Sequence, residues 1–186
     1  MKKVVVLFAA FIMLTLNQAF AYRATDFSSD SKIVAAINML DQRGESDVLR
    51  NLQRYAIRIS FDDLSSVSFN SSKAFAVSTY NKYGTRVIMI NSIYKNAPTE
   101  QIACLIAHES CHKAKVATLA EETLATQTEA KYWLKLKNPN KIYTDNDLKN
   151  RLDNLAYLYS HSDKNNNRIE ERIANSDFYR NQLSIK

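Results

Sequence analysis

Two histidines four residues apart, with a glutamate directly after the first, are the residues of this chain best suited to do chemistry. They lie in the segment His108-Glu109-Ser110-Cys111-His112. Residues i and i+4 of a helix share one face, so both imidazole rings can reach a single metal ion. Zinc suits such a pair, because three protein ligands leave its fourth position for water, and Glu109 would take the proton from that water. We therefore predict His108 and His112 as zinc ligands and Glu109 as a general base.

A third ligand must come from elsewhere in the chain. The only histidine after His112 is His161, which does not fit a histidine ligand pattern, so a carboxylate is expected. Glu121 and Glu122 follow His112 by nine and ten residues. One continuous helix would place them about 14–15 Å further along its axis, out of reach of the ion. The chain must therefore break between His112 and these glutamates.

The break is predicted at residues 116–118. The next residues, Thr-Leu-Ala-Glu at 118–121, match the capping box that begins a helix, in which the glutamate folds back on the helix start. That role occupies Glu121 and leaves Glu122 free, so we predict Glu122 as the third zinc ligand and keep Glu121 as the alternative. Glu129 shares the helix face of Glu122. Without a metal, such acidic residues are explained by their favourable interaction with the helix dipole.

Hydrophobic periodicity predicts the elements that position these residues. Helices are expected over residues 32–42, 47–55, 100–112, 119–136, 147–159 and 167–178, and strands over residues 57–61, 74–80 and 86–94. The last two strands form a hairpin whose turn contains Gly84. The helix that bears the histidines is apolar all round from Ile102 to Ala107, which is typical of a centrally buried helix. Thr144 is expected to cap the helix that follows it.

These elements indicate an α+β fold. We expect a small antiparallel sheet packed on the helix at 100–112 and on the Glu122-bearing helix after it, with C-terminal helices from about residue 144. The strand segment 87–90 is apolar on both faces, so we expect it to be covered on both sides. Cys104 and Cys111 are seven residues apart on one helix, about 10 Å between Cα atoms, which is too far for a disulfide.

The first 21 residues are expected to be a cleaved secretory signal. Lys2 and Lys3 precede an apolar run of 13 residues at 4–16, and Ala19-Phe20-Ala21 matches a signal-peptidase site. A helix of that length is too short for a bilayer of about 30 Å. We therefore expect cleavage after Ala21, a secreted or periplasmic protein without a stable membrane anchor, and a single domain over residues 22–186.

Composition excludes several classes of protein. The chain has only two Gly and two Pro, which argues against an all-β fold and against glycine-rich phosphate loops. Its formal net charge is +6, which falls to +4 when the expected signal is removed. This excess is spread along the chain and is too small to indicate nucleic acid as a partner.

The chain resembles the gluzincin type of zinc metallopeptidase over about residues 57–136. The shared features are the apolar helix with the HExxH motif at 108–112, the preceding β-hairpin, and the following helix with the segment from Glu122 to Ala125. The resemblance implies a small secreted bacterial member with a minimal zincin-like catalytic domain. It also implies that peptide or protein substrates are hydrolysed with Glu109 as base, and that the strand at 86–91 lines the cleft beside an extended substrate.

Other functions remain open on the sequence alone. No residue is an evident donor to the oxyanion of the reaction, and the candidates by residue type are His161, Tyr80, Tyr83 and Tyr94. A non-catalytic binding or structural module, with a structural metal or none, is the alternative to an enzyme. An enzyme that cuts a non-peptide amide, such as a cell-wall link, is a third possibility, because HExxH does not specify the bond.

Overall fold

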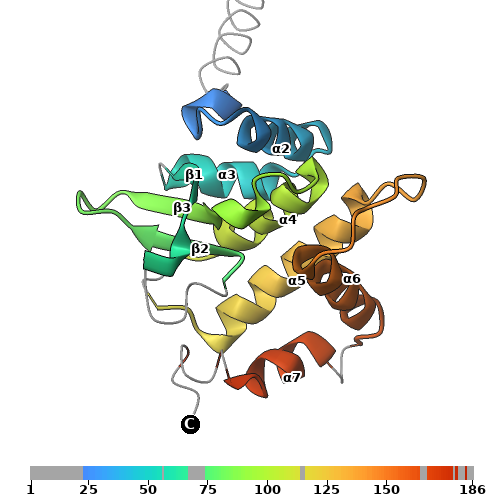
Figure 1. Ribbon diagram of the computed structural model, residues 1–186. Helices are drawn as coiled ribbons and strands as arrows, with labels where there is room; N and C mark the ends of the chain where they lie inside the picture. The colour runs from blue at the N-terminus through green and yellow to red at the C-terminus, as the bar shows by residue number, and fades with distance from the viewer. Residues whose placement is uncertain are drawn as a thin grey trace, which may run out of the picture.

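The computed structural model of the protein describes residues 23–55, 57–66, 74–113, 116–163 and 167–177, together with Tyr179 and Leu183. The expected signal segment at 1–21 lies outside these residues. Within the described ranges, none of the helices has the length and hydropathy needed to cross a membrane. The chain has an α+β fold in which a small three-stranded sheet lies at one side of the molecule and packs against helices (Figure 1).

The predicted helices and strands are all present, with ends that differ by a few residues. The helices are α2 (Ser31–Gln42), α3 (Ser46–Arg54), α4 (Thr99–Ser110), α5 (Leu119–Leu136), α6 (Asp147–Ser160) and α7 (Arg168–Ala174). The strands are β1 (Arg58–Asp62), β2 (Ala76–Tyr80) and β3 (Arg86–Asn91). The strand expected to reach residue 94 instead ends at Asn91 and continues as a 3₁₀ turn, Ser92–Tyr94.

The sheet is mixed, so the expected antiparallel sheet is wrong for one of its strands. β2 and β3 are antiparallel, joined by a turn in which Gly84 has a φ of +75°. β1 pairs with β3 in parallel, with Ile59 opposite Ile88. The alternating pattern of β1 predicts which of its faces is buried, but it contains no information on the direction of its neighbour.

β3 is the central strand and β2 is an edge strand. The sheet order is β1-β3-β2, so β3 is hydrogen-bonded on both sides. Ile88 and Ile90 on one face are fully buried, whereas Val87 and Met89 on the other are half-buried. β3 is therefore fully covered on the face of Ile88 and Ile90 and only partly covered on the other face, where full cover was expected on both.

Helix α4 lies at the centre of the molecule, as its apolar sequence predicts. In Figure 1 it lies between α2 and α3 on one side and α5 on the other. It contacts α2, α3, α5, α6 and the strands β2 and β3, and every residue from Glu100 to Ser110 is buried. Cys104 and Cys111 are both buried and free, in agreement with the absence of a disulfide expected from their spacing. A helix surrounded on all sides has a fixed position, which suits it to hold a site at its end.

The start of α5 is fixed by the predicted cap. Thr118 Oγ1 accepts a hydrogen bond from the backbone N–H of Glu121 at 3.2 Å. At the start of α6 the expected cap is wrong, because the side chain of Asn146, not that of Thr144, accepts from Lys149 N at 2.8 Å.

The two threonines provide a matched test of capping. Thr118→Ala is expected to lower the free energy of unfolding by about 1 kcal/mol, because an N-terminal amide of α5 loses its acceptor. Thr144→Ala removes an exposed threonine that does not cap, and a change below about 0.5 kcal/mol is expected. Urea unfolding curves measure both values. Equal losses in the two variants would contradict the assigned cap.

Candidate metal centre

The two histidines of the motif lie at the end of α4. The helix ends at Ser110, two residues earlier than predicted, and Cys111 is its C-cap. The chain still turns tightly there, because His112 N donates to the carbonyl oxygen of Glu109 at 3.4 Å. The His108 and His112 rings consequently remain neighbours, with centroids 5.2 Å apart and planes at 64°.

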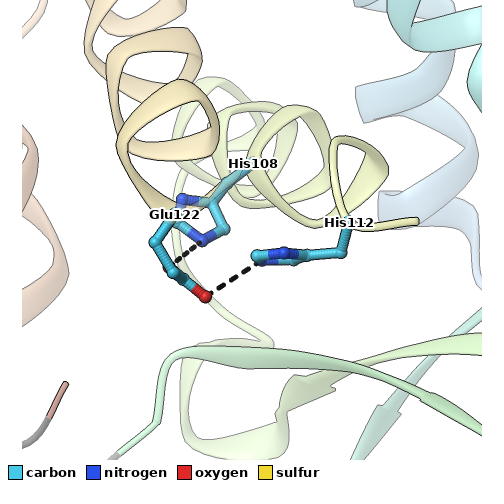
Figure 2. Close-up of side chains that lie close together, drawn as sticks. All are labelled: His108, His112 and Glu122. Carbon is cyan, nitrogen blue, oxygen red and sulfur yellow. Dashed lines mark ion pairs between the residues drawn. The ribbon is translucent and has the colours of Figure 1, made fainter. Parts of the chain in front are cut away.

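Glu122 reaches the two rings from the first turn of α5. Figure 2 shows its carboxylate between the imidazoles, with one oxygen directed to each ring. Oε2 lies 3.7 Å from His108 Nε2, and Oε1 lies 3.6 Å from His112 Nε2. The break in the chain predicted before Thr118 is what allows α5 to return to the end of α4.

These three side chains can hold a metal ion. One donor atom from each lies within 4.8 Å of the others. Ligands of a tetrahedral zinc ion, with bonds of about 2.0–2.1 Å, lie about 3.4 Å apart, so a small movement brings the group to coordinating geometry. The side chains are buried, with exposed fractions of 8% for His108, 11% for His112 and 9% for Glu122. Glu122 Oε2 has no hydrogen-bond partner among the described residues, as expected of an atom that a metal would bind.

Glu121, the alternative third ligand, has a different role. Its Oε1 accepts a hydrogen bond from the backbone N–H of Lys113, the residue after His112. It therefore does not fold back on Thr118 as the capping box predicts, and it is not part of the group of three in the part of the chain that the structure describes. The two adjacent glutamates thus have different contacts. Glu122 faces the rings, and Glu121 stabilises the turn that follows His112.

Arg86 on β3 supports the same turn from the sheet. Its Nη2 donates to the carbonyl oxygen of Glu109 at 3.2 Å, and its Nε donates to Ser78 Oγ of β2 at 2.9 Å. The side chain is almost completely buried. The last turn of α4 is therefore held by the sheet through Arg86 and by α5 through Glu121.

A second carboxylate on α5 orients the first histidine. Glu129 is fully buried, and its Oε2 lies 3.0 Å from His108 Nδ1. Arg151 of α6 donates two hydrogen bonds to the same carboxylate, Nε to Oε1 at 3.0 Å and Nη2 to Oε2 at 2.8 Å. A carboxylate this close to Nδ1 favours a proton on that nitrogen, so Nε2 is the ring nitrogen available to a metal. Sequence reasoning noted Glu129 only as a neighbour of Glu122 and missed Arg151.

Glu109, the predicted base, lies beside this group. Its Oε2 is 3.8 Å from His112 Nε2. Burial raises the pKa of Glu109 to about 7. Burial is the largest cause that lowers the pKa of His112 to about 3, and the positive charge of Arg86 acts in the same direction. His112 is therefore neutral at neutral pH, the form in which an imidazole binds a metal.

A cleft of about 520 Å³ opens onto this group of three side chains. Its lining includes His108, Glu109, His112 and Glu122, and its sheet-side wall is formed by residues 74–78. This corrects the expectation that the strand at 86–91 lines the cleft. β3 is the central strand and has both neighbours, and the edge strand β2 takes the place beside the site.

The tyrosines and the histidine expected as oxyanion donors lie elsewhere. None of Tyr80, Tyr83, Tyr94 and His161 lines the cleft. Tyr179, near the C-terminus, does. The sequence pattern did not single out Tyr179, because it lies six residues after Ile173 and beyond the end of α7 at Ala174.

No protein-family model matches this chain, and neither a curated protein nor a solved structure matches it. The assignment of a function therefore rests on the geometry of the site.

Proposed function

We propose that this protein is a zinc-dependent metallopeptidase of gluzincin type that acts outside the cytoplasm. The observation that supports this most directly is the Glu122 carboxylate lying between the Nε2 atoms of His108 and His112, at 3.7 and 3.6 Å. Two imidazoles with one carboxylate are the ligand set of catalytic zinc sites that keep a position open for water. A closed structural zinc site uses four protein ligands, and only three are grouped among the residues described.

Each part of the cleft has a role in the proposed reaction. Zinc bound by the three ligands would supply a polarised water and an electrophile for the scissile carbonyl. Glu109 accepts the proton of the attacking water and returns it to the leaving amine. Among the described strands β2 pairs only with β3, so its other edge presents backbone N–H and C=O groups with which an extended peptide can pair.

Tyr179 is a candidate donor to the oxyanion in this proposal. Its phenol is hydrogen-bonded to Arg151, and because a guanidinium only donates, the phenol oxygen is the acceptor of that bond. The O–H of Tyr179 can then be donated into the cleft, where a developing negative charge on the substrate oxygen would accept it.

Metal content and peptide hydrolysis test the proposal together. Elemental analysis of the purified protein is expected to give about one zinc per chain. A mixture of end-blocked fluorogenic peptides is expected to be cleaved, with the activity lost on chelation and regained when zinc is added. Stoichiometric zinc without cleavage would contradict the peptidase and indicate a structural site or another amide substrate, and a protein that takes up no zinc would contradict the metal centre.

A further inference from the structure

Arg172 adds a cation to the apolar part of the cleft. It lies on α7, which packs against α5 and α6, and its exposed side chain lines the cleft. Phe75, Leu105 and Leu183 line the same cleft and provide apolar surface. The region between β2 and α7 therefore combines an apolar wall with a positive charge at its rim.

The two arginines that line the cleft differ in their partners. Arg151 is engaged by Glu129, by Tyr179 and by the ring of Phe75, whose centroid lies 5.3 Å from its Cζ. Arg172 forms no ion pair with an acid in the described part of the chain.

The sequence of α7 explains the lack of a partner for Arg172. The residues three and four positions before it are Ile169 and Arg168, and those three and four positions after it are Asn175 and Ser176. Ile169 and Arg168 are the positions of the same helix from which a side chain could pair with it, whereas Asn175 and Ser176 follow the helix end at Ala174. None of the four is acidic. An arginine that lines a cleft and is not paired with an acidic side chain of the protein is available to an acidic group of a ligand.

We propose that Arg172 binds a carboxylate of the substrate, so that the cleft selects peptides with an acidic group near the bond that is cut. This inference rests on the proposed peptidase function and adds its substrate class. The carboxylate can belong to an Asp or Glu side chain or to the C-terminus of the peptide, since a guanidinium pairs with both in the same bidentate way.

Single-position peptide sets test the preference. End-blocked peptides that differ only by Glu, Gln or Lys report on a side-chain carboxylate, and a neutral peptide with a free or an amidated C-terminus reports on the terminal one. In one of these arms the wild-type protein is expected to prefer the acidic member over its neutral counterpart by about tenfold in kcat/KM, the size of one partly exposed charge-assisted hydrogen bond. Equal values in both arms would overturn the proposal.

Charge reversal assigns the preference to Arg172. Arg172→Glu is expected to abolish the preference for the acid and to favour the Lys peptide. Arg168→Glu is the matched control, because Arg168 lies on the same helix but does not line the cleft. A loss of preference of the same size in both variants would show a long-range charge effect and overturn the assignment to Arg172.

Binding separates this inference from the peptidase itself. Fluorescence anisotropy with the same peptides, in the presence of chelator, measures Kd without any hydrolysis. A tighter Kd for the acidic peptide that is lost in Arg172→Glu supports the site even if no peptide is cleaved, and such a result would overturn only the proposed function. Equal Kd values for the acidic and neutral peptides would overturn the role of Arg172 whether or not cleavage occurs.

Discussion

In the proposed peptidase, Glu109→Gln is expected to keep zinc binding and to lower kcat by about 10²- to 10⁴-fold, the range for removal of a general base. The substitution keeps the size of the side chain but removes its capacity to accept a proton. His108, His112 and Glu122 are unchanged, so the three ligand side chains remain in place. Zinc content by elemental analysis and kcat on the cleaved fluorogenic peptides measure the two properties separately.

Glu100→Gln is the matched control for this substitution. Glu100 is a second buried glutamate of α4, at the opposite end of the helix, where it is paired with Lys141 at 2.8 Å. The same chemical change at this position is expected to leave kcat within about twofold, since Glu100 does not line the cleft. Retention of full hydrolysis by the Glu109→Gln variant would refute the role of Glu109, and an equal loss in both variants would point to general damage to α4.

The parts of the site that could be predicted from the sequence are those fixed by local geometry. The spacing of His108 and His112 places both rings on one side of the chain, and this holds even though the helix ends before His112. The break before α5 follows from distance alone. Glu122 rather than Glu121 lies with the histidines, as predicted, although Glu121 is engaged by Lys113 and not by the start of its own helix. Each of these inferences depends on fewer than a dozen consecutive residues.

The parts that could not be predicted depend on contacts between distant segments. Glu129 meets Arg151 only because α5 packs against α6, and the two residues are separated by 22 positions in the chain. The parallel pairing of β1 with β3 depends on how the chain crosses the sheet, which periodicity does not encode. The same pairing makes β3 the central strand, so that β3 has neighbours on both sides and the edge strand β2 lines the cleft.

Competition between nearby polar residues explains the remaining errors. Glu121 could accept a hydrogen bond from the start of its own helix or from Lys113, and the close approach of the two helices favours Lys113. Thr144 and Asn146 could each cap α6, and the structure uses Asn146, which accepts from the N–H three residues later. In both cases the sequence identifies the correct type of interaction but not the residue that makes it.

Glu129→Ala is expected to weaken both the fold and the metal centre. Removal of the carboxylate leaves the Arg151 guanidinium largely buried without its acid, at a cost of about 3 kcal/mol in the free energy of unfolding. This value is at the lower end for buried pairs, because the Arg151 side chain is 20% exposed and water can partly solvate its charge. Zinc affinity is expected to fall by about 10- to 100-fold, because His108 Nδ1 loses the acceptor that fixes its tautomer.

A double variant separates these two effects. Glu129→Leu combined with Arg151→Met replaces the ion pair by apolar side chains, which is often neutral for stability. Urea unfolding of the chelated protein is expected to show that most of the loss of about 3 kcal/mol in the free energy of unfolding, seen in Glu129→Ala, is restored. The zinc affinity, measured by competition with a chromogenic chelator, is expected to stay about 10- to 100-fold below the wild type, since neither new side chain can accept from His108.

Wild-type affinity in the double variant would show that Glu129 only neutralises Arg151. Weak affinity in a stable double variant would instead show that Glu129 positions the ring, because a protein that is merely destabilised regains its ligand affinity when its stability is restored.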